Sequence, residues 1–254
     1  MITTYHRPRT LEEVIALISR PHPKTLPLGG GTLLSHFQAE TVEVVDLQAL
    51  GLNQIKKKGN NLEMGATTTL QQLLENKDFP NAFHPALKLE APLNIRNAAT
   101  VAGTLVVSDG RSTFTTVLLA LDSKVIVQPD EQELLIGNLL PLRKNLLQGK
   151  LITKIVIPLN IKVAFHYISR TPSDKPIVCM ALARWPSGRT RLAVGGCGNV
   201  PLLAMDGTES AGLEAAARNA FNDANDNWAS AEYRQEVAGI LANRCLAIMG
   251  LVNK

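Results

Sequence analysis

Leu28-Gly29-Gly30-Gly31-Thr32-Leu33-Leu34 is the stretch around which this sequence is organised, and it is accompanied by a second stretch of small residues, Ile95-Arg96-Asn97-Ala98-Ala99-Thr100-Val101-Ala102-Gly103-Thr104. Three consecutive glycines can adopt positive φ angles and carry no Cβ atoms, so their N–H groups can approach an anion closely. The first stretch therefore predicts a phosphate-binding loop. It also fits a tight strand-to-helix turn that binds nothing.

The composition is typical of a soluble globular protein of one to three domains, because 45% of the 254 residues are hydrophobic and 19% are charged. The net charge is +4, and the basic residues are scattered among the acidic ones apart from one run, Lys56-Lys57-Lys58. Binding nucleic acid requires several clustered phosphate contacts. We therefore interpret the lysine run as a solvated turn before a strand and expect no nucleic-acid partner.

Three cysteines, Cys179, Cys197 and Cys245, lie far apart in the sequence. Their number and spacing predict neither a disulfide framework nor an iron–sulfur site, and they fit a reducing compartment. The five histidines show no metal-binding spacing, so no metal site is expected. No signal peptide and no apolar run long enough to span a membrane is present. We therefore expect a cytoplasmic protein without membrane insertion.

About the first 50 residues of the chain predict a βαβ-like unit. Thr10-Leu11-Glu12-Glu13 has the pattern of a capping box and begins an amphipathic helix over residues 10–20. Residues 24–28 form a predicted strand that leads into the glycines, after which Leu33, Leu34 and Phe37 are expected to begin a helical turn. The β-rich segment 42–47 closes the unit.

A second unit is expected from Asn53 to Pro158, and its helices and strands are predicted from capping patterns and apolar runs. The expected elements are a strand at 62–64, a helix opened by the capping box Thr69-Leu70-Gln71-Gln72, a helix at 84–90, an apolar segment at 113–121 of either type, and strands at 123–128 and 151–157.

Beyond Pro158 the pattern predicts an antiparallel meander of three strands, at 163–168, 177–185 and 190–194. Two helices follow, one over residues 210–221 and a longer one from Ser230. The longer helix is expected to bury a stripe of four residues, Tyr233, Val237, Ile240 and Leu241. The third unit is thus predicted to be a three-stranded antiparallel sheet covered by helices.

Neither glycine stretch matches the GxGxxG or P-loop fingerprints of nucleotide-binding proteins. The chain instead resembles the medium, FAD-binding subunit of the xanthine dehydrogenase and carbon monoxide dehydrogenase family of molybdenum hydroxylases. The resemblance runs nearly end to end. It rests on Leu28 to Leu34, Ile95-Arg96-Asn97, Thr100 to Gly103, Leu118 to Asp122, Tyr167, Arg170, Asp174, Gly195-Gly196, Pro201 and Ser230-Ala231-Glu232-Tyr233-Arg234.

The resemblance implies an α+β fold: a two-lobed FAD-binding domain of the vanillyl-alcohol oxidase (PCMH) type, followed by a C-terminal domain with the three-stranded antiparallel sheet and its helices. The corresponding boundaries are residues 1–53 for the first lobe, 54–158 for the second, and 159–254 for a C-terminal domain of the carbon monoxide dehydrogenase flavoprotein type. In this family both loops surround the pyrophosphate of FAD with backbone N–H groups, and the flavin carries the chemistry.

The resemblance also assigns cofactor-binding residues. Leu28, Gly29, Gly30, Gly31, Thr32 and Leu33 correspond to the first loop, and Thr100, Ala102, Gly103 and Thr104 to the second. Thr113 occupies the place of an aspartate that contacts the sugar portion of FAD, and Asp109 is a possible substitute for that aspartate. Ile152 and His166 correspond to positions near the isoalloxazine ring. No catalytic side chain and no metal ligand are expected.

At four positions the sequence departs from the family pattern. Ala102 replaces a glycine, Thr104 and Val107 replace asparagines, and Thr113 replaces the aspartate. Each hydrogen bond to a charged group that is lost in this way weakens the free energy of FAD binding by about 1.5–3 kcal/mol. These departures favour a second hypothesis, in which the chain is a degenerate paralogue that has lost FAD and serves as a scaffold or assembly subunit.

The main hypothesis is an FAD subunit of a molybdenum hydroxylase-like oxidoreductase. It passes electrons from a [2Fe–2S] subunit, which belongs to a complex with a large molybdopterin subunit, through FAD to NAD, a quinone or oxygen. A third hypothesis, a nucleotide- or small-anion-binding regulator, requires the first loop alone.

Overall fold

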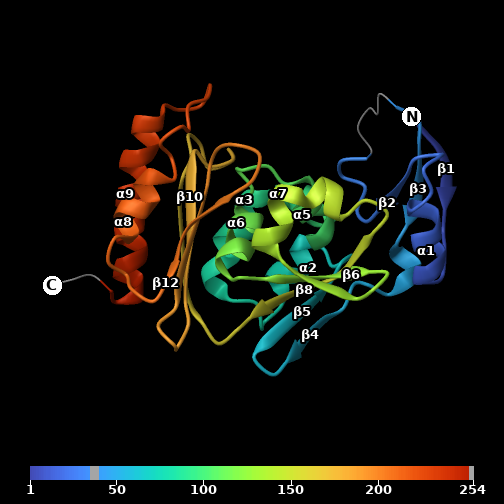
Figure 1. The fold of residues 1–254 in the computed structure, drawn as a ribbon, viewed down its shortest axis with the longest axis horizontal. Helices are drawn as coiled ribbons and strands as arrows, with labels where there is room; N and C mark the ends of the chain where they lie inside the picture. Colours follow the sequence, from blue (N-terminus) through green and yellow to red (C-terminus); the bar gives the residue numbers. More distant parts are fainter. Residues whose placement is uncertain (35–39, 252–254) are drawn as a thin grey trace. The chain divides into compact units, whose positions relative to one another are not determined.

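The chain divides into two units, each assembled from separated stretches of sequence, in a computed structural model that describes residues 1–34 and 40–251. Unit 1 contains Met1–Asp78, Leu93–Val106 and Lys124–Ile157, and unit 2 contains Phe79–Pro92, Val107–Ser123 and Pro158–Lys254. Figure 1 shows the elements of both units. The helical turn predicted to include Phe37 lies outside the described residues at that position.

A small parallel sheet begins unit 1. Its strands are β1 (Ile2–His6), β2 (Thr25–Leu28) and β3 (Val42–Asp46), in the order β1-β3-β2. Helix α1 (Leu11–Ile18) starts after Thr10, whose side chain accepts a hydrogen bond from the Glu13 N–H, and it buries Val14 against Val45. The predicted helix and both predicted strands are confirmed. Strand β1 was not predicted, because four of its five residues are exposed and carry no apolar alternation.

A five-stranded sheet completes the strands of unit 1, in the order β4-β5-β8-β6-β7. Its strands are β4 (Ile55–Lys58), β5 (Asn61–Gly65), β6 (Lys124–Gln128), β7 (Gln132–Leu135) and β8 (Leu151–Pro158). The lysine run predicted to be a turn lies in β4, so that prediction was wrong. An edge strand with outward lysines carries no apolar pattern, and β4 is defined by its antiparallel pairing with β5.

Besides α1, the helical elements of unit 1 are η1 (Gln48–Leu50), α2 (Leu70–Glu75), α4 (Leu93–Arg96), α5 (Val101–Val107) and α7 (Ile136–Leu146), although the last residue of α5 belongs to unit 2. The predicted capping box before α2 is confirmed. The Thr69 hydroxyl accepts a hydrogen bond from the Gln72 N–H, and the Gln72 side chain accepts one from the Thr69 N–H.

Unit 2 is built on an antiparallel meander of four strands, in the order β12-β11-β10-β9. They are β9 (Lys162–Ile168), β10 (Val178–Arg184), β11 (Thr190–Gly195) and β12 (Leu202–Gly207). The predicted meander is confirmed, but the prediction of three strands was wrong. The fourth strand is an edge strand that leaves Leu202 and Leu203 exposed, so its residues do not alternate in the way that a half-buried strand does.

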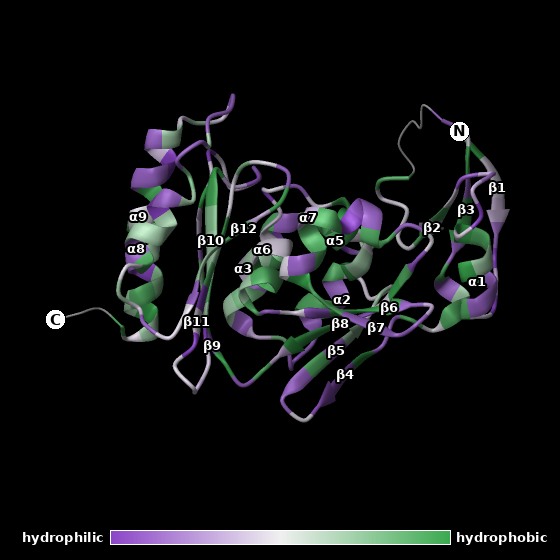
Figure 2. Ribbon diagram, viewed as in Figure 1, coloured by the Kyte–Doolittle hydropathy of each residue, from purple (hydrophilic) through white to green (hydrophobic). Residues whose placement is uncertain are grey.

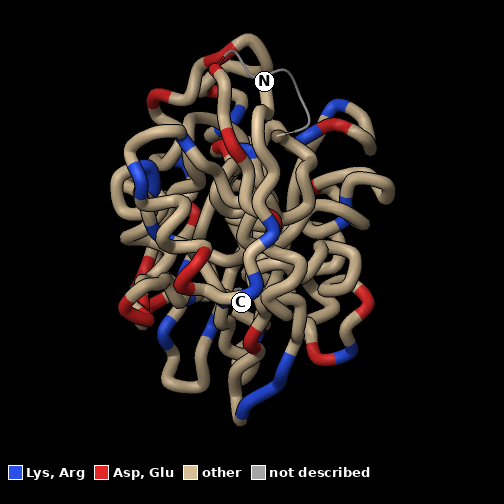
Figure 3. Tube along the Cα trace, turned by 90° about the vertical axis from the view of Figure 1, so that its right-hand side faces the viewer, with Lys and Arg blue, Asp and Glu red and all other residues tan. Residues whose placement is uncertain are grey.

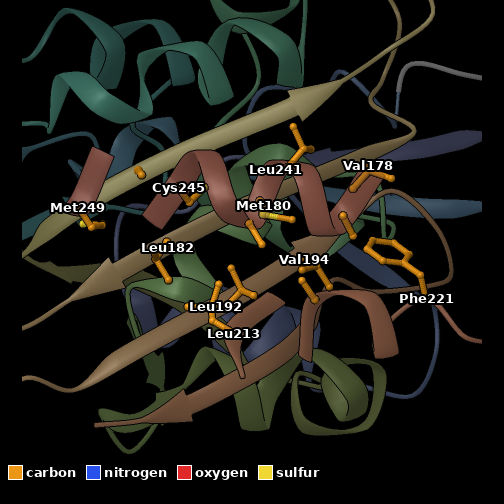
Figure 4. Close-up of a cluster of buried hydrophobic side chains, with 14 of the residues drawn as sticks. Val178, Met180, Leu182, Leu192, Val194, Leu213, Phe221, Leu241, Cys245 and Met249 are labelled. Carbon is orange, nitrogen blue, oxygen red and sulfur yellow. The ribbon is translucent and has the colours of Figure 1, made fainter. Parts of the chain in front are cut away.

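Helices pack on both faces of this sheet. On one face, α8 (Leu213–Asn219) and α9 (Ala231–Met249) enclose a core with Met180, Leu182 and Val194, as Figure 4 shows. On the other face, α6 (Thr113–Ala120) contacts β10 and β11, and α3 (His84–Glu90), preceded by η2 (Asn81–Phe83), packs on α6. The ambiguous segment 113–121 is therefore a helix, and all eight residues of α6 are buried. Figure 2 shows the corresponding hydrophobic colouring of β10.

The buried face of α9 differs from the predicted stripe. Leu241 is buried as expected, but Tyr233 and Ile240 are 42% and 46% exposed, whereas Arg234 is fully buried. The guanidinium of Arg234 donates to the carbonyl oxygens of Ile177, Ala224 and Ala229 and to the carboxylate of Asp226. These hydrogen bonds offset the cost of burying the charge, which a pattern of apolar residues cannot reveal.

In the view of Figure 3, lysines and arginines lie scattered among acidic residues along the described chain. None of the helices in the described ranges has the length and apolar character that crossing a bilayer requires. Within the same ranges, no group of three or more histidine, cysteine or acidic side chains is arranged to hold a metal ion.

Candidate functional site

The glycine stretch leaves β2 at Leu28 and forms a loop whose backbone donors are available. Gly29 and Gly31 are partly exposed and Gly30 is exposed, and Gly31 has a φ of +69°. Among the described residues, the N–H groups of Gly29, Gly30, Gly31 and Thr32 donate to no partner. Four consecutive free amides with no Cβ atoms on three of the residues form a suitable surface for an anion.

Glycine is required in this loop because the loop lies directly against the second stretch. A Cβ atom on Gly30 would stand 1.7 Å from the carbonyl oxygen of Ala98, and one on Gly29 would stand 2.8 Å from Oγ1 of Thr100. A side chain at Gly30 would require the backbone to move, and one at Gly29 would displace the side chain of Thr100. The two stretches, separated by about 70 residues in the sequence, are therefore in van der Waals contact within unit 1.

The second stretch connects α4 to α5, and its amide groups are already used. The N–H groups of Val101 and Ala102 donate to the carbonyl oxygens of Thr68 (2.8 Å) and Ala66 (3.2 Å). The N–H group of Gly103 donates to Oγ1 of Thr100 (3.1 Å), and that of Thr104 donates to the Thr100 carbonyl oxygen (2.8 Å). The start of α5 is thus satisfied by the chain itself, unlike the glycine loop.

The substituted positions of the second stretch differ in exposure. Ala102 and Thr104 are 9% and 8% exposed, whereas Val107 is half exposed. Gly103 is exposed, and a Cβ atom there would stand 2.8 Å from Oγ1 of Thr100. The Thr100 hydroxyl therefore lies close to both glycines, Gly29 and Gly103, and is itself buried.

The predicted site residues Asp109 and Thr113 lie in unit 2 and are hydrogen-bonded within that unit. Asp109 is half exposed, pairs with Nζ of Lys175 at 3.1 Å and accepts a hydrogen bond from the Arg111 N–H. Thr113 is fully buried, and its hydroxyl donates to the Ala86 carbonyl oxygen at 2.6 Å and to Glu90 at 3.1 Å. The Thr113 hydroxyl is therefore engaged inside this unit.

Glu90 is a polar residue beside Thr113 that the sequence analysis did not identify. Its Oε2 atom accepts hydrogen bonds from the hydroxyl groups of Ser112 and Thr113 and from the N–H of Phe114. Burial raises the pKa of the Glu90 carboxyl above its ordinary value, while these hydrogen bonds oppose the rise. A glutamate at the end of a predicted helix gives no sequence signal that it will accept hydrogen bonds from residues 22 to 24 positions further along the chain.

The loop that carries Asp109 is held by a second glycine-rich segment in unit 2. The N–H of Gly110 donates to the Gly198 carbonyl oxygen at 3.0 Å, and the N–H of Gly196 donates to the Gly110 carbonyl oxygen at 2.8 Å. A Cβ atom on Gly110 would stand 1.8 Å from the carbonyl oxygen of Cys197. The Gly195-Gly196 pair noted in the sequence is thus part of a tight backbone contact.

Ile152 and His166 lie in strands of different units. Ile152 is a buried residue of β8 that pairs with Val127 of β6 in unit 1. His166 pairs with Met180 in unit 2 and shares its face of the sheet, toward the core formed with α8 and α9. Burial, together with the charge of Arg244, lowers the pKa of His166. Its Nε2 atom is buried and has no hydrogen-bond partner in the described chain.

The residues present in unit 1 fit the phosphate-bearing part of a dinucleotide such as FAD. The free amides of the glycine loop can donate to phosphate oxygens, and the absence of side chains permits the close approach. The structure brings the two predicted loops together. It places the other predicted residues, Asp109, Thr113, Ile152 and His166, in the separate surroundings described above.

Comparison with known proteins places this fold in a class. Residues 1–160 match the family model described as "FAD binding domain in molybdopterin dehydrogenase". The chain is therefore a flavoprotein of the oxidoreductase class, with FAD as the cofactor of its domain. It belongs to the family of FAD-binding domains of molybdopterin dehydrogenases. The predicted family, fold class and cofactor are confirmed at this level.

Similar proteins cover nearly the whole chain. The glyceraldehyde dehydrogenase medium chain of Sulfolobus acidocaldarius is 24% identical over 94% of this chain and 95% of its own length. The carbon monoxide dehydrogenase medium chain of Afipia carboxidovorans is 25% identical over 95% and 94%. An uncharacterised protein of Escherichia coli K12, YgfM, is 27% identical over 95% and 94%.

Solved structures show the same fold. A chain of the Cu,Mo carbon monoxide dehydrogenase superposes with a TM-score of 0.80 at 21% identity, covering 97% of this chain and 98% of the other. A chain of quinoline 2-oxidoreductase from Pseudomonas putida 86 gives 0.79 at 19% identity, covering 98% of both. The relatives that have functional names are medium chains or subunits of dehydrogenases, so the chain corresponds to that type of subunit.

Proposed function

We propose that this chain is the FAD-carrying subunit of a molybdenum hydroxylase-like complex, which receives electrons from an iron–sulfur subunit and delivers them to NAD, a quinone or oxygen. The observation that supports this most directly is the glycine loop with four amides free among the described residues, in a chain whose family binds FAD. When bound, FAD supplies the electron-transfer chemistry that no protein side chain can provide.

The residues of the chain have a binding and orienting role in this proposal. The amides of Gly29, Gly30, Gly31 and Thr32 would donate to the phosphates, with Leu28 and Leu33 at the two ends of the loop. No side chain has to act as a nucleophile or a general base, because electron transfer requires a positioned cofactor. Asp109, Ile152 and His166 remain candidates for contacts with other parts of FAD.

The cysteine content and the names of the relatives support partner subunits. Cys179, Cys197 and Cys245 are all free, and their spacing does not suit an iron–sulfur cluster. A [2Fe–2S] subunit beside a large molybdopterin subunit is the proposed source of the electrons. Two relatives are named medium chains, and a third is named a subunit of the 6-hydroxypseudooxynicotine dehydrogenase complex.

A second candidate function is a scaffold subunit that has lost FAD. The observation in its favour is the replacement of polar or small residues by Ala102, Thr104, Val107 and Thr113. The geometry of unit 2 adds to it, because the Thr113 hydroxyl is buried and already bonded to Ala86 and Glu90.

Reconstitution separates the two candidates. Purified chain is incubated with excess FAD and desalted, and the retained flavin is measured by its visible absorbance, with circular dichroism as a control for folding. The proposed function predicts close to one FAD retained per chain. A folded protein that retains none would refute it and support the scaffold.

A further inference from the structure

The two loops at the proposed FAD site differ in one physical respect, the state of their backbone donors. At the start of α5, the amides of Val101, Ala102, Gly103 and Thr104 are all bonded within the chain, at 2.8 to 3.2 Å. In the glycine loop, the four amides from Gly29 to Thr32 have no partner among the described residues. An amide that already donates to a carbonyl oxygen must break that bond before it can donate to a phosphate.

We propose that in this chain the glycine loop alone supplies backbone donors to the pyrophosphate of FAD, and that Thr100 is a positioning residue that fixes this loop. This inference rests on the proposed function. It assigns the second stretch a different role from the one expected from the family resemblance, since its backbone supports the first loop and makes no contact of its own with the phosphates.

Thr100 can fix the loop because of where its side chain lies. It is 5% exposed, and its Oγ1 and Cγ2 atoms would be 2.8 and 3.3 Å from a Cβ atom on Gly29. Its hydroxyl oxygen also accepts the hydrogen bond from the Gly103 N–H. The Thr100 hydroxyl thus accepts a hydrogen bond at the start of α5 and lies beside Gly29, so a change in the size or polarity of this side chain affects both loops.

The backbone on either side of Thr100 is anchored as well. The Leu70 N–H donates to the Ala99 carbonyl oxygen at 2.9 Å, and the Val101 N–H donates to the Thr68 carbonyl oxygen at 2.8 Å, so Thr69 and Thr100 face each other in a β-bridge. The Ala98 carbonyl oxygen is the atom that excludes a side chain at Gly30. The second stretch is therefore a rigid surface against which the glycine loop is placed.

The same argument predicts that the methyl group of Ala102 does not affect FAD binding. Its amide donates to Ala66, so it is directed into unit 1 and is not available to a phosphate. Replacing the methyl group by hydrogen in Ala102→Gly leaves that hydrogen bond in place. Thr113→Asp would restore the aspartate of the family pattern, but it would also bring a second carboxylate to within hydrogen-bonding distance of Glu90.

Three variants test the assignment by FAD affinity, measured from quenching of flavin fluorescence, with a thermal melt of each protein as the folding control. Thr100→Val removes the hydroxyl at nearly constant volume and is expected to weaken FAD binding about tenfold or more. Thr100→Ser keeps the hydroxyl and is expected to restore binding to within about threefold of the natural chain. Ala102→Gly is expected to leave the affinity unchanged within the same range.

Hydrogen exchange measured by mass spectrometry provides a readout that does not depend on variants. Without FAD, the amides of residues 101–104 are expected to exchange slowly and those of residues 29–32 rapidly. Adding FAD should slow exchange at 29–32 and change nothing at 101–104. New protection at 101–104, or tighter binding by Ala102→Gly, overturns this assignment while leaving the proposed function intact. A natural chain that binds no FAD overturns both.

Discussion

Gly30→Ala is the substitution for which the structure gives the sharpest expectation. The added Cβ atom would stand 1.7 Å from the Ala98 carbonyl oxygen and 2.5 Å from its carbonyl carbon, both backbone atoms that cannot rotate away. Real Cβ atoms essentially never come closer than 3.0 Å to such an atom. The glycine loop must therefore move by more than 1 Å away from the second stretch, an estimate that follows directly from these two distances.

Two measurable losses follow from that movement. Overpacking of this kind costs about 1–3 kcal/mol of folding free energy, and at about 2–4 °C per kcal/mol the melting temperature should fall by several degrees. If one amide no longer reaches the phosphate, the loss is about 1.5–3 kcal/mol, which corresponds to about ten- to hundredfold weaker FAD binding. Thermal melts and fluorescence titration with FAD measure the two quantities.

Gly207→Ala is the matched control. A Cβ atom at Gly207, in β12, would meet only Cε of Met205, at an ordinary contact distance of 3.9 Å. This variant should melt and bind FAD as the natural chain does. If Gly30→Ala behaves in the same way as Gly207→Ala, the contact between the two stretches is not tight in solution, and the explanation for the glycines given above fails.

Two further predictions concern unit 2. Burial raises the pKa of Glu90 above its ordinary value of 4.5, so the contribution of Glu90 to stability is fully present below about pH 4.5 and is lost as the pH rises through the raised pKa. The Glu90→Gln variant stays neutral, so in urea unfolding it should lose less stability than the natural chain between about pH 4.5 and neutrality. Parallel pH profiles of the two proteins would contradict this. Arg234→Met leaves the carbonyl oxygens of Ile177 and Ala224 without their donor, at about 1–3 kcal/mol for each unsatisfied buried group, and removes the ion pair with Asp226. It should therefore lower the free energy of unfolding by about 2 kcal/mol or more, whereas Arg244→Met on the exposed side of the same helix should have little effect.

Much of the local structure could be predicted from the sequence because its causes are local. The capping box at Thr69 and Gln72 defines the start of α2, and the Ser230 side chain, which accepts a hydrogen bond from the Tyr233 N–H, defines the start of α9. The long β-branched run at 151–157 is strand β8. Each of these signals lies within a few residues of the element it specifies.

The errors arose where the structure of a residue depends on a pairing or hydrogen-bond partner that the apolar pattern of the sequence does not show. Lys56 to Lys58 form a strand because β5 pairs with them, and β12 is a strand because it completes the edge of the meander. Arg234 is buried because three carbonyl oxygens from other segments surround its guanidinium. Apolar periodicity reports neither strand pairing nor the hydrogen bonds that make a buried charge tolerable.

The sequence alone determined that Gly29 to Gly31 form a loop after a strand, that the second stretch accompanies it, and that the chain resembles an FAD-binding subunit. Only the tertiary structure decided which of the two stretches has backbone N–H groups available for a phosphate. The amides at the start of α5 are bonded to Ala66, Thr68 and Thr100, whereas those of the glycine loop are free among the described residues. The reason is that a sequence shows which residues can donate a hydrogen bond, but the folded backbone decides which donors remain available.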